Sequence, residues 1–467
     1  MGLRIDRGHL KKVKQALSAP SVSVRSIFQE FGDVEVAGGV LMLASAVLAL
    51  AWANSPWAEQ YFRLWEMELS IGIGQLVFSK SLHAWVNDGL MALFFFVVGL
   101  EIKREVLAGE LSAPRRAALP IAAAFGGMLL PALVYTLFNA GGPAARGWGI
   151  PVATDIAFTL GVLALLKRRV PAALKVFFAA LAIADDIGAV LIIALFYTGE
   201  IIWLNVAAAA AIMLGLVALN QFKVTKPMPY ALLGVALWLA LLESGFHATI
   251  AGVLVAMTIP ARTHVDVTEY LEEARALLDA DQQAGAEGHD VLAGGRRQSV
   301  AQALEHASEL VETPLQRLEH ALHPWVSYVV IPLFALANAG VSFEAIDPAM
   351  LLHPLTIGVA AGLVLGKPLG VSLLAWLAVR VGLAELPDRV SWPQLFGASW
   401  LAGIGFTMSL FIASLAFEDG DMLVLAKLGI MAASVIAGTV GWLLVRVTSD
   451  VEQQQERQLD MLSEASR

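Results

Sequence analysis

Two adjacent aspartates interrupt a long apolar stretch of the sequence. AIADDIGAVLI, residues 182–192, places Asp185 and Asp186 within an apolar run from about Pro171 to Tyr197. A charge at the centre of a membrane-spanning helix costs about 2.5–3.5 kcal/mol. Neighbouring residues of a helix point about 100° apart, so the two carboxylates must meet different surroundings. One can pair with a base, while the other can bind either a proton or a hard cation, which prefers oxygen ligands.

The other ionisable residues in apolar segments are few. Lys367, in LVLGKPLG, is the deep base available to an aspartate or to a helix end. Lys427 lies close enough to the end of its segment for its ammonium group to reach the surface. Asp88, in WVNDGLMALFFF, is either solvated near the outer end of its segment or a buried structural partner. Glu101 closes that segment in VVGLEIKRE.

Two apolar segments carry helix-breaking residues at matching depth. Thr154 and Asp155 follow a glycine and a proline in GIPVATD, and WLAGIGFTMS occupies residues 400–409. Paired interruptions of this kind indicate a transport site built from discontinuous helices, although such glycines also serve close helix packing. Asp155 can either compensate the positive N-terminal ends of half-helices or bind an ion. The second interruption contains no acid, so we expect a positive group, for which Lys367 is the candidate, at its negative helix ends.

Composition assigns the chain to the polytopic membrane proteins. Hydrophobic residues make up 58% of its 467 positions and charged residues 15%, whereas soluble domains contain about 45–50% and about 25%. The absence of cysteine excludes disulfides and thiolate metal sites. A net charge of −9 argues against nucleic acid as a partner, and no cofactor is indicated.

Segments long enough to cross a bilayer predict an all-α protein of twelve transmembrane helices. Of 31 lysines and arginines, 26 fall in loops or tails on one side of these segments, and only Arg63, Lys80 and Arg146 fall on the other. The positive-inside rule therefore places both termini in the cytoplasm. The first segment follows a basic stretch, as a signal peptide does, but its length and the segments that follow indicate that it is retained. The twelve predicted spans are 35–53, 83–103, 117–138, 148–166, 172–197, 201–220, 228–243, 246–260, 324–342, 355–380, 393–416 and 421–445.

Two segments outside the spans have patterns of their own. Apolar residues alternate in 65–81 around a glycine-containing turn, which predicts a β-hairpin on the outer face, with an irregular loop as the alternative. Residues 261–322 carry twelve acids and five bases, with helical spacing on either side of a glycine-rich link. This insertion is either a solvated cytoplasmic helical hairpin or, because of its histidines, a pH-responsive element. We expect 1–34 and 447–467 to be a cytoplasmic N-terminal segment and tail flanking a transporter domain, 35–446.

Seven ordered motifs resemble the bacterial NhaA sodium/proton antiporters. The resemblance runs from about Glu35 to Arg446 and departs from the family in the length of the insertion and in Gln316, where a basic residue is expected. It implies inverted-topology repeats that cross at two broken helices, spans 4 and 11. The motifs are WVNDGLMALFFFVVGLEIKRE, PVATDIAFTLGVLALL, ALAIADDIGAVLIIALFYT, SGFHATIAGVLVA, LEHALHPWVSYVVIPLFALANAGV, LGKPLG and GIGFTMSLFIASLAF.

The same resemblance implies roles for individual residues. Asp186 would be the main ligand of Na⁺ or Li⁺. Asp185 would be a second ligand that also takes part in proton exchange and pairs with Lys367. Thr154 and Asp155 match the family's residues at the crossing of the two broken helices. Asp88 is an accessory acid. A pH-response group is implied at Glu101, Glu105, Glu319, His320, His323 and His247.

The family also implies the physiological activity. Its members are electrogenic, pH-regulated antiporters of the bacterial inner membrane that export Na⁺ or Li⁺ in exchange for protons by alternating access, for pH and sodium homeostasis. The hairpin matches the element through which they form homodimers. Two other functional classes fit the residues less well. An intramembrane aspartyl protease needs two aspartates on facing spans, and a channel or symporter needs no titrating pair beside a lysine. The prediction is a secondary transporter and not an enzyme.

Overall fold

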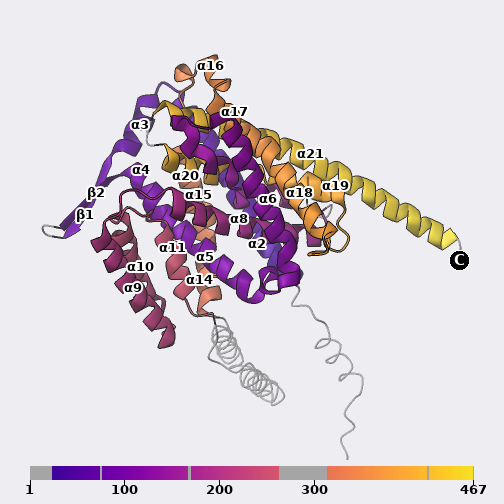
Figure 1. Ribbon diagram of the computed structural model, residues 1–467, viewed down its shortest axis with the longest axis horizontal. Coiled ribbons are helices and arrows are strands. Elements are labelled where there is room, and N and C mark those ends of the chain that lie inside the picture. The colour runs from indigo at the N-terminus through magenta and orange to yellow at the C-terminus, as the bar shows by residue number, and fades with distance from the viewer. Residues whose placement is uncertain (1–23, 74–75, 167–169, 262–312, 418–419, 466–467) are drawn as a thin grey trace, which may run out of the picture.

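The computed structural model describes residues 24–73, 76–166, 170–261, 313–417 and 420–465, and these are mostly helical (Figure 1). Most of the predicted insertion, 262–312, and the first 23 residues lie outside this part. Within the described residues, eight helices are long and apolar enough to cross a membrane, or nine if the bent pair Trp392–Leu401 and Phe406–Ala416 counts as one span. The eight are Val36–Ala53, Pro114–Asn139, Pro143–Leu165, Ala172–Phe196, Trp203–Gln221, Pro314–Asn338, Pro354–Arg380 and Asp421–Ser449.

Three of the twelve predicted spans are not confirmed by length and composition. The span at 83–103 corresponds to a helical run whose main part, α5, carries four charged residues in EIKRE at its end. The spans at 228–243 and 246–260 correspond to α10 (Pro227–Leu242), of 16 residues, and α11 (Ile250–Thr258), of nine. Each is too short or too charged to qualify as a span by itself.

The first half of the described chain runs from α2 to α8. Its elements are α2 (Val24–Ala53), α3 (Ala58–Glu66), β1 (Glu68–Ile73), β2 (Leu76–Ser81), α4 (Leu82–Ala84), the π-helical η1 (Trp85–Leu90), α5 (Met91–Ala108), η2 (Glu110–Ser112), α6 (Pro114–Asn139), the 3₁₀ helix η3 (Pro143–Val152), α7 (Ile156–Leu165) and α8 (Ala172–Phe196).

The second half runs from α9 to α21. Its elements are α9 (Trp203–Gln221), α10 (Pro227–Leu242), α11 (Ile250–Thr258), α14 (Pro314–Trp325), the π-helical η5 (Val326–Val330), α15 (Ile331–Asn338), η6 (Phe343–Ala345), α16 (Pro348–Leu351), α17 (Pro354–Ala361), the π-helical η7 (Gly362–Gly366), α18 (Lys367–Arg380), α19 (Trp392–Leu401), α20 (Phe406–Ala416) and α21 (Asp421–Ala465). The last helix continues beyond the predicted start of the tail at 447.

The β-hairpin is present, so the alternative of an irregular loop is wrong. β1 and β2 pair antiparallel from Glu68 opposite Ser81 to Ile73 opposite Leu76. The hairpin projects from the helices at the left of Figure 1. It is shorter than predicted at its start, because Trp65 and Glu66 end helix α3. That helix buries Tyr61 and Trp65, one turn apart, and was not predicted.

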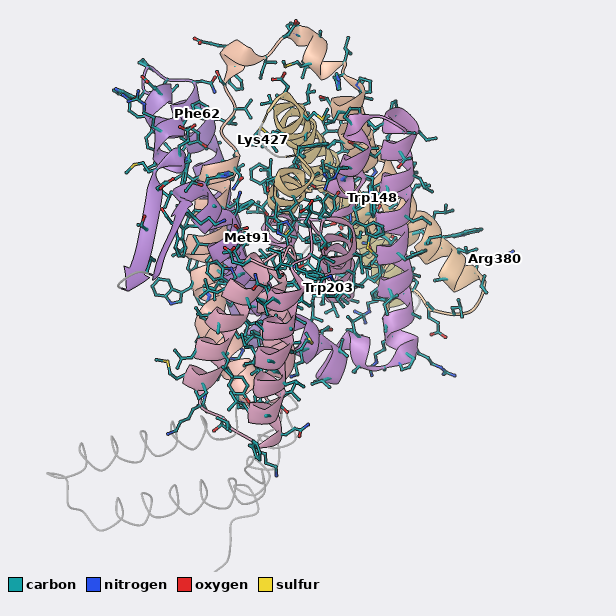
Figure 2. The ribbon with its side chains drawn as sticks, turned by 60° about the vertical axis from the view of Figure 1, so that its left-hand side comes forward. Phe62, Met91, Trp148, Trp203, Arg380 and Lys427 are labelled. Carbon is teal, nitrogen blue, oxygen red and sulfur yellow. The ribbon has the colours of Figure 1, made fainter. Side chains whose placement is uncertain are left out.

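The helices enclose two apolar cores. The larger one gathers α2, α7, α8, α15 and α17–α21, and the smaller one lies among α9, α10, α11 and α14. Helix α5 contributes to both, with Phe95 in the larger core and Leu100 in the smaller. Figure 2 shows side chains filling the space among the helices, with Phe62 of α3 and Lys427 of α21 in the upper part of the view. Helix α5 therefore joins the two groups of helices.

Candidate functional site

The two adjacent aspartates of α8 face different neighbours. Lys367 Nζ donates a hydrogen bond to Asp185 Oδ2 at 2.6 Å, and both side chains are 1% exposed. This contact confirms the predicted pairing of Lys367 with Asp185. Asp186 is equally buried, but neither of its carboxylate oxygens has a hydrogen-bond partner among the described residues. Asp185 Oδ1 is also left without one.

The carboxylate oxygens of Asp185 and Asp186 that lack hydrogen-bond partners among the described residues are the unusual feature of this site. Buried carboxylate oxygens almost always accept hydrogen bonds, because leaving them unpaired costs several kcal/mol. The acidic neighbours of Asp186 are Asp185, Glu101 and Asp155, and its basic neighbour is Lys367. Repulsion among these acids, added to the loss of hydration, makes a proton or a cation at Asp186 favourable.

A π-helical turn precedes Lys367 and helps to aim it. Pro368 has no N–H, and in a regular α-helix its ring would clash with the carbonyl four residues earlier. The wider turn of η7 ends at Gly366, immediately before Lys367 and Pro368. The lysine then runs along α6 at Gly127, where a Cβ would lie 3.6 Å from its Cδ and 3.8 Å from its Nζ. Because Gly127 has no side chain, the lysine side chain can pass close to the backbone of α6.

Asp155 joins the N-terminal ends of two half-helices. It is the N-cap of α7, where its Oδ1 accepts a hydrogen bond from Phe158 N at 3.0 Å. Its Oδ2 accepts from Thr407 N at 3.0 Å and from Thr407 Oγ1, in the first turn of α20. Asp155 N donates in turn to Ile404 O at 2.7 Å. Both carboxylate oxygens are thus occupied by donors, which favours the capping alternative over direct ion binding in this conformation.

Hydroxyl groups, and not Lys367, satisfy the opposite helix ends. At the end of α19, Thr154 Oγ1 donates to Ala402 O at 2.9 Å and Thr159 Oγ1 donates to Leu401 O at 3.0 Å. In the other direction, Ser409 Oγ donates to Ile150 O at 2.8 Å near the end of η3. Neutral hydroxyl donors from each broken span thus bond to carbonyls of the other, whereas Lys367 bonds to Asp185.

Three residues of this crossing had no predicted role. Thr407, Thr159 and Ser409 all lie within the quoted motifs, but a hydroxyl among apolar residues is an ambiguous signal in sequence. Each follows an interruption by a few positions, which is where side chains bond to the ends of half-helices. That spacing was the available clue.

The predicted pH-response residues divide between two places. Arg104 Nη1 lies 3.1 Å from Glu319 Oε1, and His323 Nε2 lies 3.9 Å from Glu101 Oε1, so α5 and α14 meet in an ionic cluster. Glu319 is fully buried and His320 is exposed beside it on α14. Arg104 was quoted in a motif but was not assigned a role.

Glu105 and Gln316 make local contacts instead. Glu105 Oε1 accepts a hydrogen bond from Glu110 N at 2.6 Å, in the connection between α5 and α6. Gln316 forms a capping box with Thr313 at the start of α14, in which each side chain bonds to the other residue's backbone N–H. This cap accounts for an amide at the position where a basic residue was expected.

Asp88 and His247 make contacts with other residues. Asp88, in η1, lines a small cavity with Lys80, Trp85 and Trp238, and its carbonyl accepts a hydrogen bond from the Trp238 indole at 3.0 Å. His247 lies between α10 and α11, with its ring centroid 6.3 Å from that of Phe411.

Comparison with known proteins identifies the family. The sequence model of the Na⁺/H⁺ antiporter 1 family matches residues 29–445. The chain is 50% identical over 416 residues to the Na(+)/H(+) antiporter NhaA of Koribacter versatilis, covering 89% of this chain and 90% of that protein. The NhaA proteins of Oleidesulfovibrio alaskensis and Acidithiobacillus ferrooxidans are 51% and 49% identical over 90% of this chain, covering 93% and 96% of their lengths. The resemblance found in the sequence is thereby confirmed, and the chain belongs to the NhaA-type Na⁺/H⁺ antiporter family.

Proposed function

We propose that this protein exchanges Na⁺ for protons at the paired aspartates of α8. The observation that carries the proposal is the buried Asp186, whose two oxygens lack hydrogen-bond partners among the described residues, beside an Asp185 already paired with Lys367. Sodium is a hard cation and takes oxygen ligands. Asp186 Oδ1 and Oδ2, with Asp185 Oδ1, offer three such oxygens, and the remaining ligands would be water.

Exchange follows from competition for the same oxygens. A carboxylate that holds a proton no longer attracts Na⁺, and one that holds Na⁺ repels a proton. Lys367 neutralises Asp185, so a cation arriving at Asp186 meets one uncompensated charge. Release on the opposite side of the membrane needs a second conformation in which the ion binds differently. Alternating access at the crossing of the two broken spans would supply that conformation.

Several finer properties follow from the family resemblance and belong to the same proposal. They are export of Na⁺ or Li⁺, movement of net charge because more than one proton enters per cation, and activation by pH for pH and sodium homeostasis. The α5–α14 ionic cluster, with Glu101, Glu319, His320 and His323, supports pH regulation because it brings acidic and basic side chains of two helices together, so that a change in their protonation would alter the contact between the helices. Glu105 and His247 would contribute from outside the cluster. Asp88 would be an accessory acid.

The proposed architecture is a transporter domain over 35–446 with twelve spans and inverted repeats. The reciprocal bonding of the two broken spans supports inverted repeats, because each span serves the other in the same way. Helices α5, α10 and α11 would complete the twelve. The insertion at 261–322 and the ends, 1–34 and 447–467, would face the cytoplasm from the bacterial inner membrane.

The hairpin is the proposed dimer contact. An isolated two-stranded sheet is marginally stable in water, yet β1 exposes Leu69 and Ile71 next to an exposed Met67. Pairing with a second copy would cover these side chains. Cross-linking through a cysteine placed at Ile71, followed by gel analysis, tests this contact, and a purely monomeric product would contradict it.

The two alternative classes receive less support. Asp185 and Asp186 lie on one helix and do not face each other across two spans, as an aspartyl protease requires. A channel or symporter would have no use for a buried lysine bonded to one of two adjacent acids. A secondary transporter, and not an enzyme, accounts for both features.

Proton release from the purified protein on addition of Na⁺ tests the function. The wild type should release protons, and Asp186→Asn should not, because an amide neither ionises nor attracts the cation. Asp421→Asn, which alters an exposed acid at the start of α21, is the matched control and should behave as the wild type. Proton release that survives Asp186→Asn would refute the role of Asp186.

A further inference from the structure

The outer half of the first broken span is an unusually long 3₁₀ helix. η3 covers ten residues, Pro143–Val152, and leads directly to Thr154 and Asp155. Runs of 3₁₀ helix longer than three or four residues are uncommon, because their hydrogen bonds are poorly aligned. Such a segment needs other contacts to hold its conformation.

Three hydroxyl groups from three different helices hold η3 by its backbone. Tyr135, in α6, donates to Ala144 O at 2.7 Å. Tyr197, at the end of α8, donates to Arg146 O at 2.8 Å and accepts from Gly149 N at 3.3 Å. Ser409, in α20, donates to Ile150 O. Tyr197 is the only one of the three to engage both a carbonyl and an N–H.

The glycines of η3 make room for Tyr197. A Cβ at Gly149 would lie 2.7 Å from the Tyr197 hydroxyl oxygen and 3.1 Å from its ring. Any larger residue would push the hydroxyl away from the backbone that it binds. Trp148 adds a second contact between the same elements, since its ring meets that of Phe196 edge-on with centroids 5.0 Å apart. The end of α8 and η3 are therefore fitted to each other.

Tyr197 belongs to the helix that carries the paired aspartates. It caps α8 eleven residues after Asp186, which is about three helical turns. A displacement of η3 relative to Tyr197 would therefore move Thr154 and Asp155 relative to Asp185 and Asp186. Tyr197 therefore links the helix of the paired aspartates to the segment that leads into the crossing.

We propose that Tyr197 is a positioning residue that sets the register of η3, and with it the crossing, against the paired aspartates. It touches neither ion nor proton. Because it fixes where the two broken spans stand beside Asp186, its loss should weaken Na⁺ binding more than it slows turnover. The proposal rests on Na⁺/H⁺ exchange at Asp186.

Transport in proteoliposomes tests the proposal through the Na⁺ concentration that gives half-maximal rate. Tyr197→Phe keeps the ring and removes the hydroxyl, and should raise that concentration about threefold to tenfold, the equivalent of one net hydrogen bond. The maximal rate should stay within about a factor of two. Tyr135→Phe is the matched control. It removes a tyrosine hydroxyl that also bonds to η3, but this tyrosine belongs to α6, which carries no acid. The Na⁺ concentration that gives its half-maximal rate should remain that of the wild type.

A second variant approaches the contact from the other side. Gly149→Ala should raise the half-maximal Na⁺ concentration as much as Tyr197→Phe does. The double variant should raise it no further than Gly149→Ala alone, because both substitutions remove the same contact. Additive effects, equal shifts for Tyr197→Phe and Tyr135→Phe, or no shift in any variant would overturn the positioning role. Absence of Na⁺-dependent proton movement in the wild type would instead overturn the exchange function, and so the two failures are distinguishable.

Discussion

The ion pair between Lys367 and Asp185 makes a quantitative prediction. The charged atoms are 2.6 Å apart and both side chains are 1% exposed. With an effective dielectric constant of about 20, their attraction is about 6 kcal/mol before the cost of burying two charges is subtracted. Removing one partner of such a pair destabilises proteins by about 3–5 kcal/mol, because the other charge stays buried alone. Replacing both partners by uncharged residues should cost much less.

Lys367→Met, Asp185→Asn and the double variant form the corresponding cycle. We expect each single variant to lose about 3–5 kcal/mol in the free energy of unfolding, and the double variant to lose less than either single variant, so that at least about 3 kcal/mol of the summed loss is recovered. Unfolding of the detergent-solubilised protein, followed by tryptophan fluorescence, measures all four. Lys427→Met is the control, because that lysine is partly exposed on α21 and should lose about 1 kcal/mol or less.

The same cycle has a result that would refute the reasoning. A coupling energy within about 0.5 kcal/mol of zero, the limit for independent sites, would mean that the two groups are not paired in the folded protein. In transport assays Lys367→Ala should shift the pH profile more than it alters the preference for sodium. An unmoved profile would show that the pair plays no part in proton exchange.

Two more predictions concern single hydroxyl groups. Thr407→Val removes the Oγ1 donor to Asp155 but keeps the backbone N–H. It should therefore lower the free energy of unfolding by about 1.5–3 kcal/mol, and Thr407→Ser should restore that free energy. A valine variant as stable as the wild type would contradict the capping role. Tyr61 of α3 donates to Leu336 O at 2.8 Å, and burial raises its pKa from 10.0 to about 12. Because the folded pKa is the higher one, its stabilisation is complete below about pH 10 and is lost as the pH rises through 12. Tyr61→Phe should cost about 1 kcal/mol at pH 8, measured by urea unfolding, and the gap to the wild type should narrow towards pH 11; a constant gap would exclude this linkage.

Much of the fold follows from composition and local pattern. An apolar run of about 20 residues must form a helix in a bilayer, since each backbone group has to bond within its own segment. Alternation around a glycine turn likewise predicted the hairpin. The boundaries were less accurate: α3 was missed because a nine-residue amphipathic helix has only two buried anchors, Tyr61 and Trp65. Three predicted spans fell short in length or apolarity.

The sequence by itself determined where polar residues and breaks would interrupt the apolar helices. Adjacent aspartates on a helix must point in different directions, and glycine and proline at matching depth must break two helices. The tertiary structure alone decided which hydrogen-bond donor reaches which buried carboxylate or carbonyl oxygen. Asp155 is occupied by Phe158 and Thr407 from two half-helices, while Asp186 keeps both oxygens unbonded within the described part of the chain. Partners of this kind lie about 250 residues apart in sequence, and local pattern carries no information about which distant hydroxyl or N–H will reach a buried oxygen.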